Sequence, residues 1–425
     1  MAKLLLVLIS IGMISSCSKS KDLDTSNPPP VIIPPNPVPP TGLTNETTTG
    51  IFFTSRESDG IGGAFTSFTC LNTDLSLKWK KINIGTGGTP NCFIENGKVF
   101  LSTIFFSMNP TITLKSNIYC FEQNTGNIIW NRLQIPETLT NPTVKNDTIF
   151  TSRNINNTNS IAAYSGSNGS LYWNVSNFDQ FPPYQLSLDG NNFYYFAAAN
   201  NTAPIRCESF NLTSRTLRWS NTQNNSFTSN ISAPAFSNDK LGFTVGSALG
   251  SKTLVVLNKN NGSLAWSKTS NIGSPISSDD KFFAVDADQG LYAFNAQTGA
   301  TIWQINLGNQ IRPVSSLFFS GENLYLVAQG PDATTYIYSI NANTGSLNYR
   351  TNIYRATINQ QLVVVGKNIY TFNFNNPSNS SSANLSKLYV LDATNGNLKD
   401  STNINALQVG GIGIVGSSGK IAYSR

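Results

Sequence analysis

The sequence predicts an all-β protein, an eight-bladed β-propeller with four antiparallel strands in each blade. One phrase occurs eight times: a hydrophobic strand, a tight polar turn and a second strand. Six copies carry a tryptophan at the same position, and about 45 residues separate successive copies, which is the size of one four-stranded blade. The 375 residues from 51 to 425 hold about eight such units. A ring of seven blades is the main alternative.

The Trp phrase, as we call this repeated unit, has two recurrent residues. Its tryptophans are Trp79, Trp130, Trp173, Trp219, Trp266 and Trp303, and the last two copies carry Tyr349 and Asp400 at that position. Six copies place a glycine four residues earlier: Gly126, Gly169, Gly262, Gly299, Gly345 and Gly396. Glycine readily takes the left-handed conformation of a tight turn, and tryptophan offers a large flat surface. We therefore expect these residues to join neighbouring blades rather than to line a ligand pocket.

Each unit should also contain a first strand, a hairpin turn and a second strand before its Trp phrase. The predicted second strands begin at Ile51, Val99, Ile149, Phe193, Leu241, Lys281, Leu324 and Ile369. Turn formers such as Asn96-Gly97 precede them. The last residues, 420–425, resemble a ninth second strand. Either a C-terminal strand completes the first blade, or an extra strand covers an edge, and the pattern leaves both open.

The phrase resembles the Trp-docking repeat of the pyrroloquinoline quinone (PQQ)-like propellers. That repeat reads A-x-D-x-x-T-G-x-x-x-W, and Ala293–Trp303 nearly reproduces it. The resemblance covers residues 51–425. It implies a propeller fold, and the family contains both quinoprotein dehydrogenases and non-catalytic members. Among the latter is the propeller lipoprotein of the outer-membrane β-barrel assembly machinery.

Catalytic residues are not predicted. The chain has no histidine, which removes the commonest general base and metal ligand. The family's dehydrogenases resemble this chain in their repeat but usually carry a vicinal Cys-Cys pair over the cofactor, which is absent here. Asp286 and Asp288 resemble part of a calcium loop, but a turn between two strands explains them. We expect a non-enzymatic protein of the non-catalytic branch, with no cofactor and no metal.

The first 50 residues predict export and a membrane anchor. Residues 1–16 have the charged start and short apolar stretch of a signal peptide. They end in a lipobox-like Ile14-Ser15-Ser16-Cys17, in which Cys17 would be lipidated. Residues 17–50 form a spacer expected to be disordered, and its Pro28–Pro40 segment would span roughly 40 Å as polyproline II. Residues 18–24 resemble the charged sequences of Bacteroidetes surface lipoproteins. The predicted location is the outer membrane, facing the surface or the periplasm.

Composition narrows the partners further. Charged residues are only 12% of the chain and the net charge is +6 without a basic cluster, so nucleic acid is not a predicted partner. Cys70, Cys92, Cys120 and Cys207 lack the spacing of a disulfide framework or of a CxxC motif. Cys120 stands where other copies carry Ala, Ser or Val, which indicates a packing residue. The pairing of these cysteines stays open, and the propeller is expected to be monomeric.

A binding face is predicted where the connections vary in length. The turns inside the Trp phrase and between first and second strands are uniformly short. The connections at 105–117, 153–160, 174–184, 199–205 and 374–385 vary, and in a propeller they emerge on one face. The most apolar candidates on it are Phe105, Phe106, Met108, Phe178, Phe181 and Tyr184. The leading hypothesis is a scaffold for protein partners at the outer membrane. A surface glycan- or ligand-binding lipoprotein is the alternative, and a quinoprotein oxidoreductase is less favoured.

Overall fold

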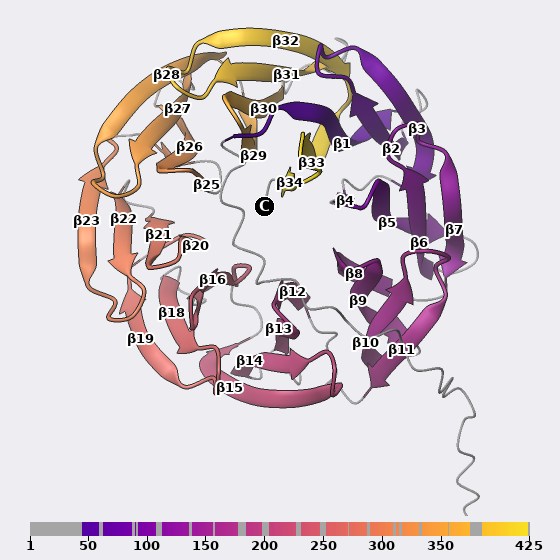
Figure 1. The fold of residues 1–425 in the computed structure, drawn as a ribbon, viewed down its shortest axis with the longest axis horizontal. Helices are drawn as coiled ribbons and strands as arrows, with labels where there is room; N and C mark the ends of the chain where they lie inside the picture. The colour runs from indigo at the N-terminus through magenta and orange to yellow at the C-terminus, as the bar shows by residue number, and fades with distance from the viewer. Residues whose placement is uncertain are drawn as a thin grey trace, which may run out of the picture. The chain divides into compact units, whose positions relative to one another are not determined.

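Eight antiparallel sheets surround a common centre, as the repeat predicts (Figure 1). The structure is a computed structural model. It describes residues 45–423 apart from 59–62, 87–89, 91, 108–112, 136–137, 156–157, 177–183, 198–203, 227–230, 247–251, 271, 287–289, 309–311, 314–316, 331–333, 356 and 375–384. The predicted signal peptide, Cys17 and nearly all of the spacer lie outside this range. Every described strand lies in the compact unit from Ile33 to Arg425.

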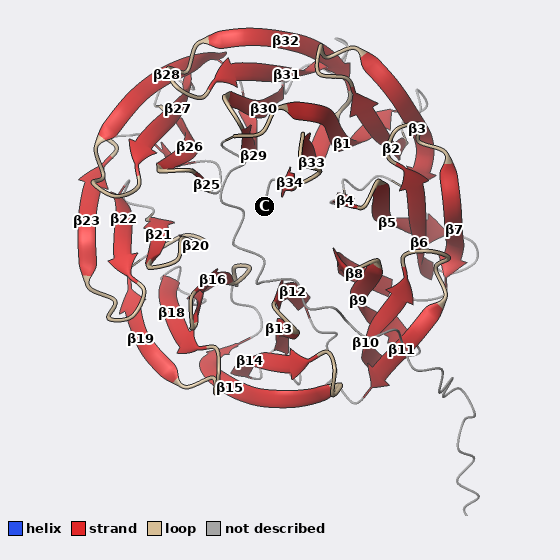
Figure 2. Ribbon diagram, in the orientation of Figure 1, coloured by secondary structure: helices blue, strands red, loops and turns tan. Residues whose placement is uncertain are grey.

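The described elements are strands joined by turns (Figure 2). In chain order they are β1 (Thr48–Ser58), β2 (Ala64–Leu71), β3 (Leu77–Gly85), β4 (Cys92–Glu95), β5 (Lys98–Ser107), β6 (Thr113–Glu122), β7 (Ile128–Ile135), β8 (Thr138–Lys145), β9 (Thr148–Ile155), β10 (Thr158–Ser165), β11 (Leu171–Ser176), β12 (Tyr184–Asp189), β13 (Asn192–Ala197), β14 (Pro204–Asn211), β15 (Thr216–Ser226), β16 (Ala235–Ser237), β17 (Lys240–Gly246), β18 (Lys252–Asn258), β19 (Leu264–Thr269), β20 (Ile276–Ser277), β21 (Lys281–Val285), β22 (Gly290–Asn295), β23 (Thr301–Asn306), β24 (Arg312–Pro313), β25 (Phe318–Ser320), β26 (Asn323–Gln329), β27 (Thr334–Asn341), β28 (Leu347–Arg355), β29 (Thr357–Val365), β30 (Asn368–Phe374), β31 (Leu385–Asp392), β32 (Leu398–Asn405), β33 (Gln408–Gly416) and β34 (Ile421–Tyr423). Within the described ranges no helix has the length and apolar character needed to cross a bilayer.

The prediction of eight blades is confirmed, and the alternative of seven is wrong. Blade 1 contains β1–β3. Blades 2 to 8 then follow in chain order as β4–β7, β8–β11, β12–β15, β16–β19, β20–β23, β24–β28 and β29–β32. All eight predicted second strands are second strands. In blade 7 the inner strand is in two pieces, because β24 and β25 both pair with β26. Pro313 in β24 has no amide to donate, which suits an edge strand.

Ring closure combines both possibilities that the sequence left open. β33 pairs with β1 and so supplies the inner strand of blade 1, whose other strands come from the start of the propeller. β34 then pairs with the free side of β33 as a fifth, innermost strand. The expected ninth second strand is therefore wrong, because residues 421–423 lie inward of β33 and not outward. β1 begins at Thr48, three residues before the boundary predicted at Ile51.

Polar contacts fasten this closure. Glu46 accepts hydrogen bonds from the Ser417 hydroxyl at 2.8 Å and the Ser418 amide at 2.6 Å. On the inner side, the Tyr423 hydroxyl accepts from the Ile94 amide at 2.5 Å and donates to the Ile94 carbonyl at 3.1 Å. Burial raises the pKa of Tyr423 well above its usual value, so the phenol keeps the proton that it donates. The two ends of the propeller are thus tied to each other and to blade 2.

The hydrophobic core lies between neighbouring blades, and the Trp residues help to build it. Trp219 of blade 4 donates its indole N–H to the Lys259 carbonyl of blade 5 at 2.8 Å, and Trp266 donates to the Ala296 carbonyl of blade 6 at 2.9 Å. Trp79, Trp130 and Trp303 make the same bond to the blade that follows. Tyr349 replaces them in blade 7, where its hydroxyl donates to the Ala393 carbonyl at 3.0 Å. The predicted inter-blade position of these aromatic residues is confirmed.

Each predicted glycine lies under an aromatic ring of the preceding blade. Gly262 has φ +71°, and a Cβ there would lie 2.4 Å from the Trp219 ring. Gly126, Gly169, Gly299, Gly345 and Gly396 face Trp79, Trp130, Trp266, Trp303 and Tyr349 in the same way. Two separate reasons therefore favour glycine at this position: the left-handed backbone conformation, and the aromatic ring that leaves no space for a Cβ.

Two junctions depart from the Trp–Gly pairing. Above Trp173, the glycine is replaced by Arg215, which keeps the left-handed conformation at φ 56° and places its guanidinium 5.5 Å from the ring centre. At the closing junction Asp400 is exposed where other blades have an aromatic ring. There blade 1 carries Leu75 in place of glycine, at φ 63° and only 6% exposed within the core cluster of blades 7, 8 and 1. Leu75 therefore supplies the apolar volume that a ring supplies elsewhere.

A β-bulge precedes the Trp position in every blade, which the sequence analysis missed. In blade 5, Val256 pairs with Trp266 and Leu257 with Leu264, so Ala265 is an extra residue. The other seven blades shift register at the same point. A bulge bends the strand and turns the following side chain. This local bend accompanies the turn of each Trp toward the next blade.

Candidate functional site

The two faces of the ring are built differently. Because strands alternate in direction, the turns between first and second strands and those between third and fourth strands share one face, which we call the turn face. The connections between second and third strands and those between blades share the opposite face, which we call the connection face. The uniform turns and variable connections of the sequence predict this division, and the antiparallel order of every blade agrees with it.

Backbone hydrogen bonds tie the turn face together. In blade 6 the Ala296 amide donates to the Asp280 carbonyl at 2.9 Å, which joins the two turns of that blade. Blades 2 to 8 all have this bond: Gln123 to Gly97, Gly166 to Asp147, Leu212 to Asn191, Lys259 to Asp239, Ala296 to Asp280, Ala342 to Glu322 and Ala393 to Lys367. Because the same bond recurs in seven blades, we interpret the turn face as part of the structural framework of the ring.

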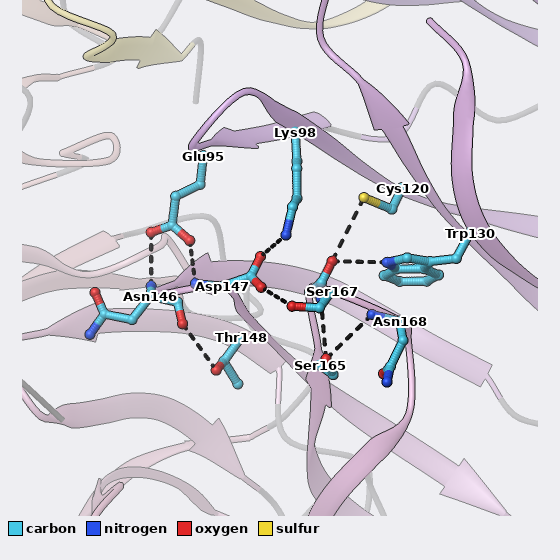
Figure 3. Close-up of polar contacts among 11 residues, drawn as sticks. Glu95, Lys98, Cys120, Trp130, Asn146, Asp147, Thr148, Ser165, Ser167 and Asn168 are labelled. Carbon is cyan, nitrogen blue, oxygen red and sulfur yellow. Dashed lines mark hydrogen bonds and ion pairs between the residues drawn. The ribbon is translucent and has the colours of Figure 1, made fainter. Parts of the chain in front are cut away.

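A polar network on the turn face joins blade 2 to blade 3 (Figure 3). The carboxylate of Glu95 accepts from the backbone amides of Asn146 at 2.8 Å and Asp147 at 2.6 Å. Both residues are left-handed, at φ 50° and 55°, and successive amides in such a turn can converge on one anion. Glu95 occupies that anion position from the neighbouring blade.

The remaining charges in this network are also paired. Lys98 of blade 2 lies 2.7 Å from the Asp147 carboxylate, which accepts from the Ser167 hydroxyl at 2.6 Å on its other oxygen (Figure 3). Trp130 and Cys120 of blade 2 both donate to the Gly166 carbonyl, at 2.8 and 3.8 Å. The network therefore joins blade 2 to blade 3. The sequence signal that could have revealed it is the combination of an acidic residue, Glu95, just before one turn and a turn without glycine, Asn146-Asp147, in the next blade.

The four cysteines of the propeller are buried and unpaired. Cys70, Cys92, Cys120 and Cys207 all carry free thiols. Burial raises the pKa of Cys70, Cys92 and Cys120 to about 12 and raises that of Cys207 as well. At neutral pH these thiols stay protonated, and a thiol without thiolate character is a poor nucleophile and a poor metal ligand. They pack in the core, as predicted for Cys120.

Few of the residues predicted for the binding face can be placed in the structure. Phe105 and Phe106 lie in β5 and Tyr184 lies in β12, so these three belong to strands and not to loops. Their side chains, and Met108, Phe178 and Phe181 entirely, lie outside the described residues. The strands extend into all five predicted variable segments because their ladders continue, as between Ser107 and Thr113.

Described polar groups near the connection face are anchored by their own neighbours. Glu208, 6% exposed, accepts from Arg206 at 2.8 Å and from the Ser220 hydroxyl at 3.0 Å. Asp286 accepts from the Gly290 amide at 2.7 Å and the Tyr292 hydroxyl at 2.8 Å, which is the turn role predicted for it. Asp288 lies outside the described residues. Among the residues that the structure does place, no group of acidic or cysteine side chains has the arrangement of a metal site.

These features define an eight-bladed propeller with a rigid framework face and an opposite face formed by variable connections. A family model described as "Outer membrane protein assembly factor BamB" matches residues 206–417. The chain is a β-propeller that is similar to this PQQ-like family over those residues, as the Trp phrase predicts. No curated protein sequence matches the chain.

Solved structures share the fold at low sequence identity. BamB from Moraxella catarrhalis is 12% identical with a TM-score of 0.52, over 79% of this chain and 96% of that one. Apo AztD from Citrobacter koseri is 10% identical with a TM-score of 0.56, over 88% of this chain and 100% of that one. The dihydro-heme d1 dehydrogenase NirN is 10% identical with a TM-score of 0.57, over 84% of this chain and 73% of that one. These similarities show the fold and do not transfer an activity.

Proposed function

We propose that this protein is a non-enzymatic propeller scaffold, anchored by lipid at Cys17, that binds protein partners at the outer membrane through its connection face. The observation that carries the proposal is the contrast between the faces. The turn face uses its backbone and charged groups within the ring. The varied connections emerge from the opposite face, where a rigid support can present them to a partner.

The chemistry of the chain supports a binding role. It has no histidine and no adjacent pair of cysteines, and the acidic side chains of the networks above accept hydrogen bonds from their own neighbours. The family match to an outer-membrane assembly factor supports protein partners in that compartment. The lipobox-like sequence at Ile14–Cys17 supports the anchor, since several acyl chains together hold a protein stably at a membrane.

Replacing Cys17 tests the anchor. In the Cys17→Ala variant we expect no incorporation of labelled palmitate and release of the protein from the membrane fraction, because the acceptor thiol is gone. Ser20→Ala, three residues later, is the matched control and should keep both label and membrane location. Persistent labelling of the Cys17→Ala variant, or a wild-type protein without label, would contradict the proposed anchor.

A glycan or other surface ligand is the second candidate for the connection face. Aromatic residues among Asn-rich connections, such as Phe178, Phe181 and Tyr184, favour it because sugars stack on aromatic rings. A glycan array separates the two functions: reproducible binding that is lost on replacing Phe181 would favour the glycan role.

A further inference from the structure

The outer rim of blades 1 to 3 differs from the rest of the ring. In the outermost strand of each blade, three positions are predominantly exposed. They lie two residues before the Trp position, one residue after it and three residues after it. The first of these is an exposed Leu or Ile in seven blades, so it belongs to the repeat. The residue type three positions after the Trp position differs among blades, so the blades can be compared with one another at that position.

At the third residue after the Trp position, only blades 1 and 2 are apolar. Ile82 is 63% exposed and Leu133 is 54% exposed. The other six blades carry Ser176, Thr222, Thr269, Asn306, Asn352 and Asn403 there. A β-strand at this position therefore folds with Ser, Thr or Asn, and the framework does not require an exposed Ile or Leu.

The bulge position, just before the Trp, extends the apolar area. Blade 2 has Ile129 and blade 3 has Tyr172 there, both strongly exposed. Blade 6 also has an exposed residue there, Ile302 at 43%, but Asn306 follows it on the same strand. The other blades have Lys78, Arg218, Ala265, Asn348 and Lys399. β3 and β7 are neighbours on the rim, with β11 next to β7 (Figure 1). Leu77, Ile82, Ile128, Ile129, Leu133 and Tyr172 form what we call the rim patch.

Basic side chains flank the rim patch on β3. Lys78 is exposed and donates to the Asn124 side chain at 3.2 Å. Lys80 is exposed and lies 2.8 Å from Glu57, and Lys81 is partly exposed. Exposed aliphatic side chains beside lysines, with a tyrosine at the margin, are the combination that partitions into an anionic lipid interface.

The position of the chain entry agrees with a lipid occupant. β1 opens blade 1 and lies two strands inward of β3, so the chain enters the ring in the blade whose outermost strand carries Ile82 and the three lysines. A single anchor holds a protein near a bilayer without fixing its orientation, and a second contact fixes it.

We propose that the rim patch of blades 1 to 3 binds an anionic lipid surface, so that the propeller stands on its edge at the membrane. Both faces of the ring then stay open to the side, and the connection face can meet a partner at membrane height. The biological setting rests on the proposed anchor, but the contact itself is a property of the ring alone.

Vesicle binding by the ring tests the proposal without Cys17. Residues 33–425 contain every described strand and close on themselves through β33 and β1, so we expect this fragment to fold alone. We expect it to co-sediment with vesicles of phosphatidylethanolamine and phosphatidylglycerol, and to bind phosphatidylcholine vesicles much less. Added salt should weaken the binding, because it screens the lysines.

The decisive variant is Ile82→Thr with Leu133→Thr, which installs the residue that Thr222 and Thr269 provide in blades 4 and 5. Removing two half-exposed aliphatic side chains should lower the partition coefficient about tenfold. Leu264→Thr with Leu347→Thr removes equally exposed leucines from blades 5 and 7 and should leave it unchanged. Equal thermal unfolding midpoints verify that both variants are folded.

Three results would overturn the proposal: no binding to the anionic vesicles, equal loss in both variants, or equal binding to phosphatidylcholine. The first would point to a protein segment as the occupant of the rim patch. Failure here leaves the palmitate result at Cys17 unaffected, so the two proposals can fail separately.

Discussion

Truncation after Leu407 is expected to abolish cooperative folding of the propeller. It removes β33 and β34. Among the described strands, β33 is the inner strand of blade 1 and the one that pairs the end of the propeller with its beginning. Val409, Ile412, Ile414 and Val415 of β33 are at most 2% exposed. Each such side chain contributes about 1.5–3 kcal/mol on burial. Their loss is comparable with the whole stability of a typical domain, about 5–15 kcal/mol.

A shorter truncation provides the control. Removal of residues 421–425 takes away only β34 and the Tyr423 contacts with Ile94, so the ring should still close on β1. Thermal unfolding followed by circular dichroism should show a lowered but cooperative transition for this variant and none for the longer truncation. A cooperative transition without β33 would contradict closure by that strand.

Gly262→Ala is expected to destabilise the junction between blades 4 and 5 by about 2–5 kcal/mol. The left-handed conformation costs alanine about 1–2 kcal/mol. The new Cβ would also meet the Trp219 ring at 2.4 Å, and overpacking of this kind adds about 1–3 kcal/mol. Trp219→Ala should cost about 3–5 kcal/mol, because it leaves a cavity and removes the bond to the Lys259 carbonyl.

Gly97→Ala separates the two contributions. Gly97 has φ +75°, but nothing lies within 4 Å of the position of its Cβ, so only the conformational cost of about 1–2 kcal/mol remains. In a Trp219→Ala background, Gly262→Ala should fall to that value, since the ring is gone. Denaturant unfolding of the four variants measures this. If Gly262→Ala and Gly97→Ala lower the free energy of unfolding equally with Trp219 present, the Trp219 ring does not explain the glycine at position 262.

The repeat made most of the fold predictable. Trp, Gly and the second strands recur because every blade packs against its neighbour in the same way. The same residue pattern therefore appears in most of the eight copies and can be recognised from the sequence. Tyr349 shows why a degenerate copy still marks a blade: its hydroxyl reaches the same carbonyl that the indole N–H reaches elsewhere. The bulge before each Trp could not be predicted in this way, because it changes register without changing the pattern of residue types.

Substitutions on one blade that are compensated by a residue of another blade were harder to predict from the sequence. Leu75 and Asp400 are 325 positions apart in the sequence, and neither one alone explains the other. Only the ring brings them to one junction, where an apolar side chain on one blade replaces the ring missing from the other. The network of Glu95, Lys98 and Asp147 has the same character, since charges from two blades become partners only after the blades meet.

The candidate site was less predictable than the framework for a physical reason. Repeated positions are constrained by packing, whereas connections are constrained mainly by what they bind, so they carry no repeat to compare. Phe105 and Phe106 illustrate this, because hairpin pairing continues through them into positions that the sequence assigned to a loop. The rim patch was overlooked because exposed aliphatic residues at Ile82 and Leu133 become unusual only when the eight blades are aligned.

Site-specific photo-cross-linking in intact membranes tests the central claim most directly. A photoreactive residue is placed near the connection face at Arg56 and Pro204, and on the turn face at Asn124 and Thr298, all of which are exposed. The scaffold proposal predicts discrete cross-linked protein adducts from the connection-face positions and none from the turn-face positions. Adducts from the turn face alone, or equal adducts from both faces, would contradict it.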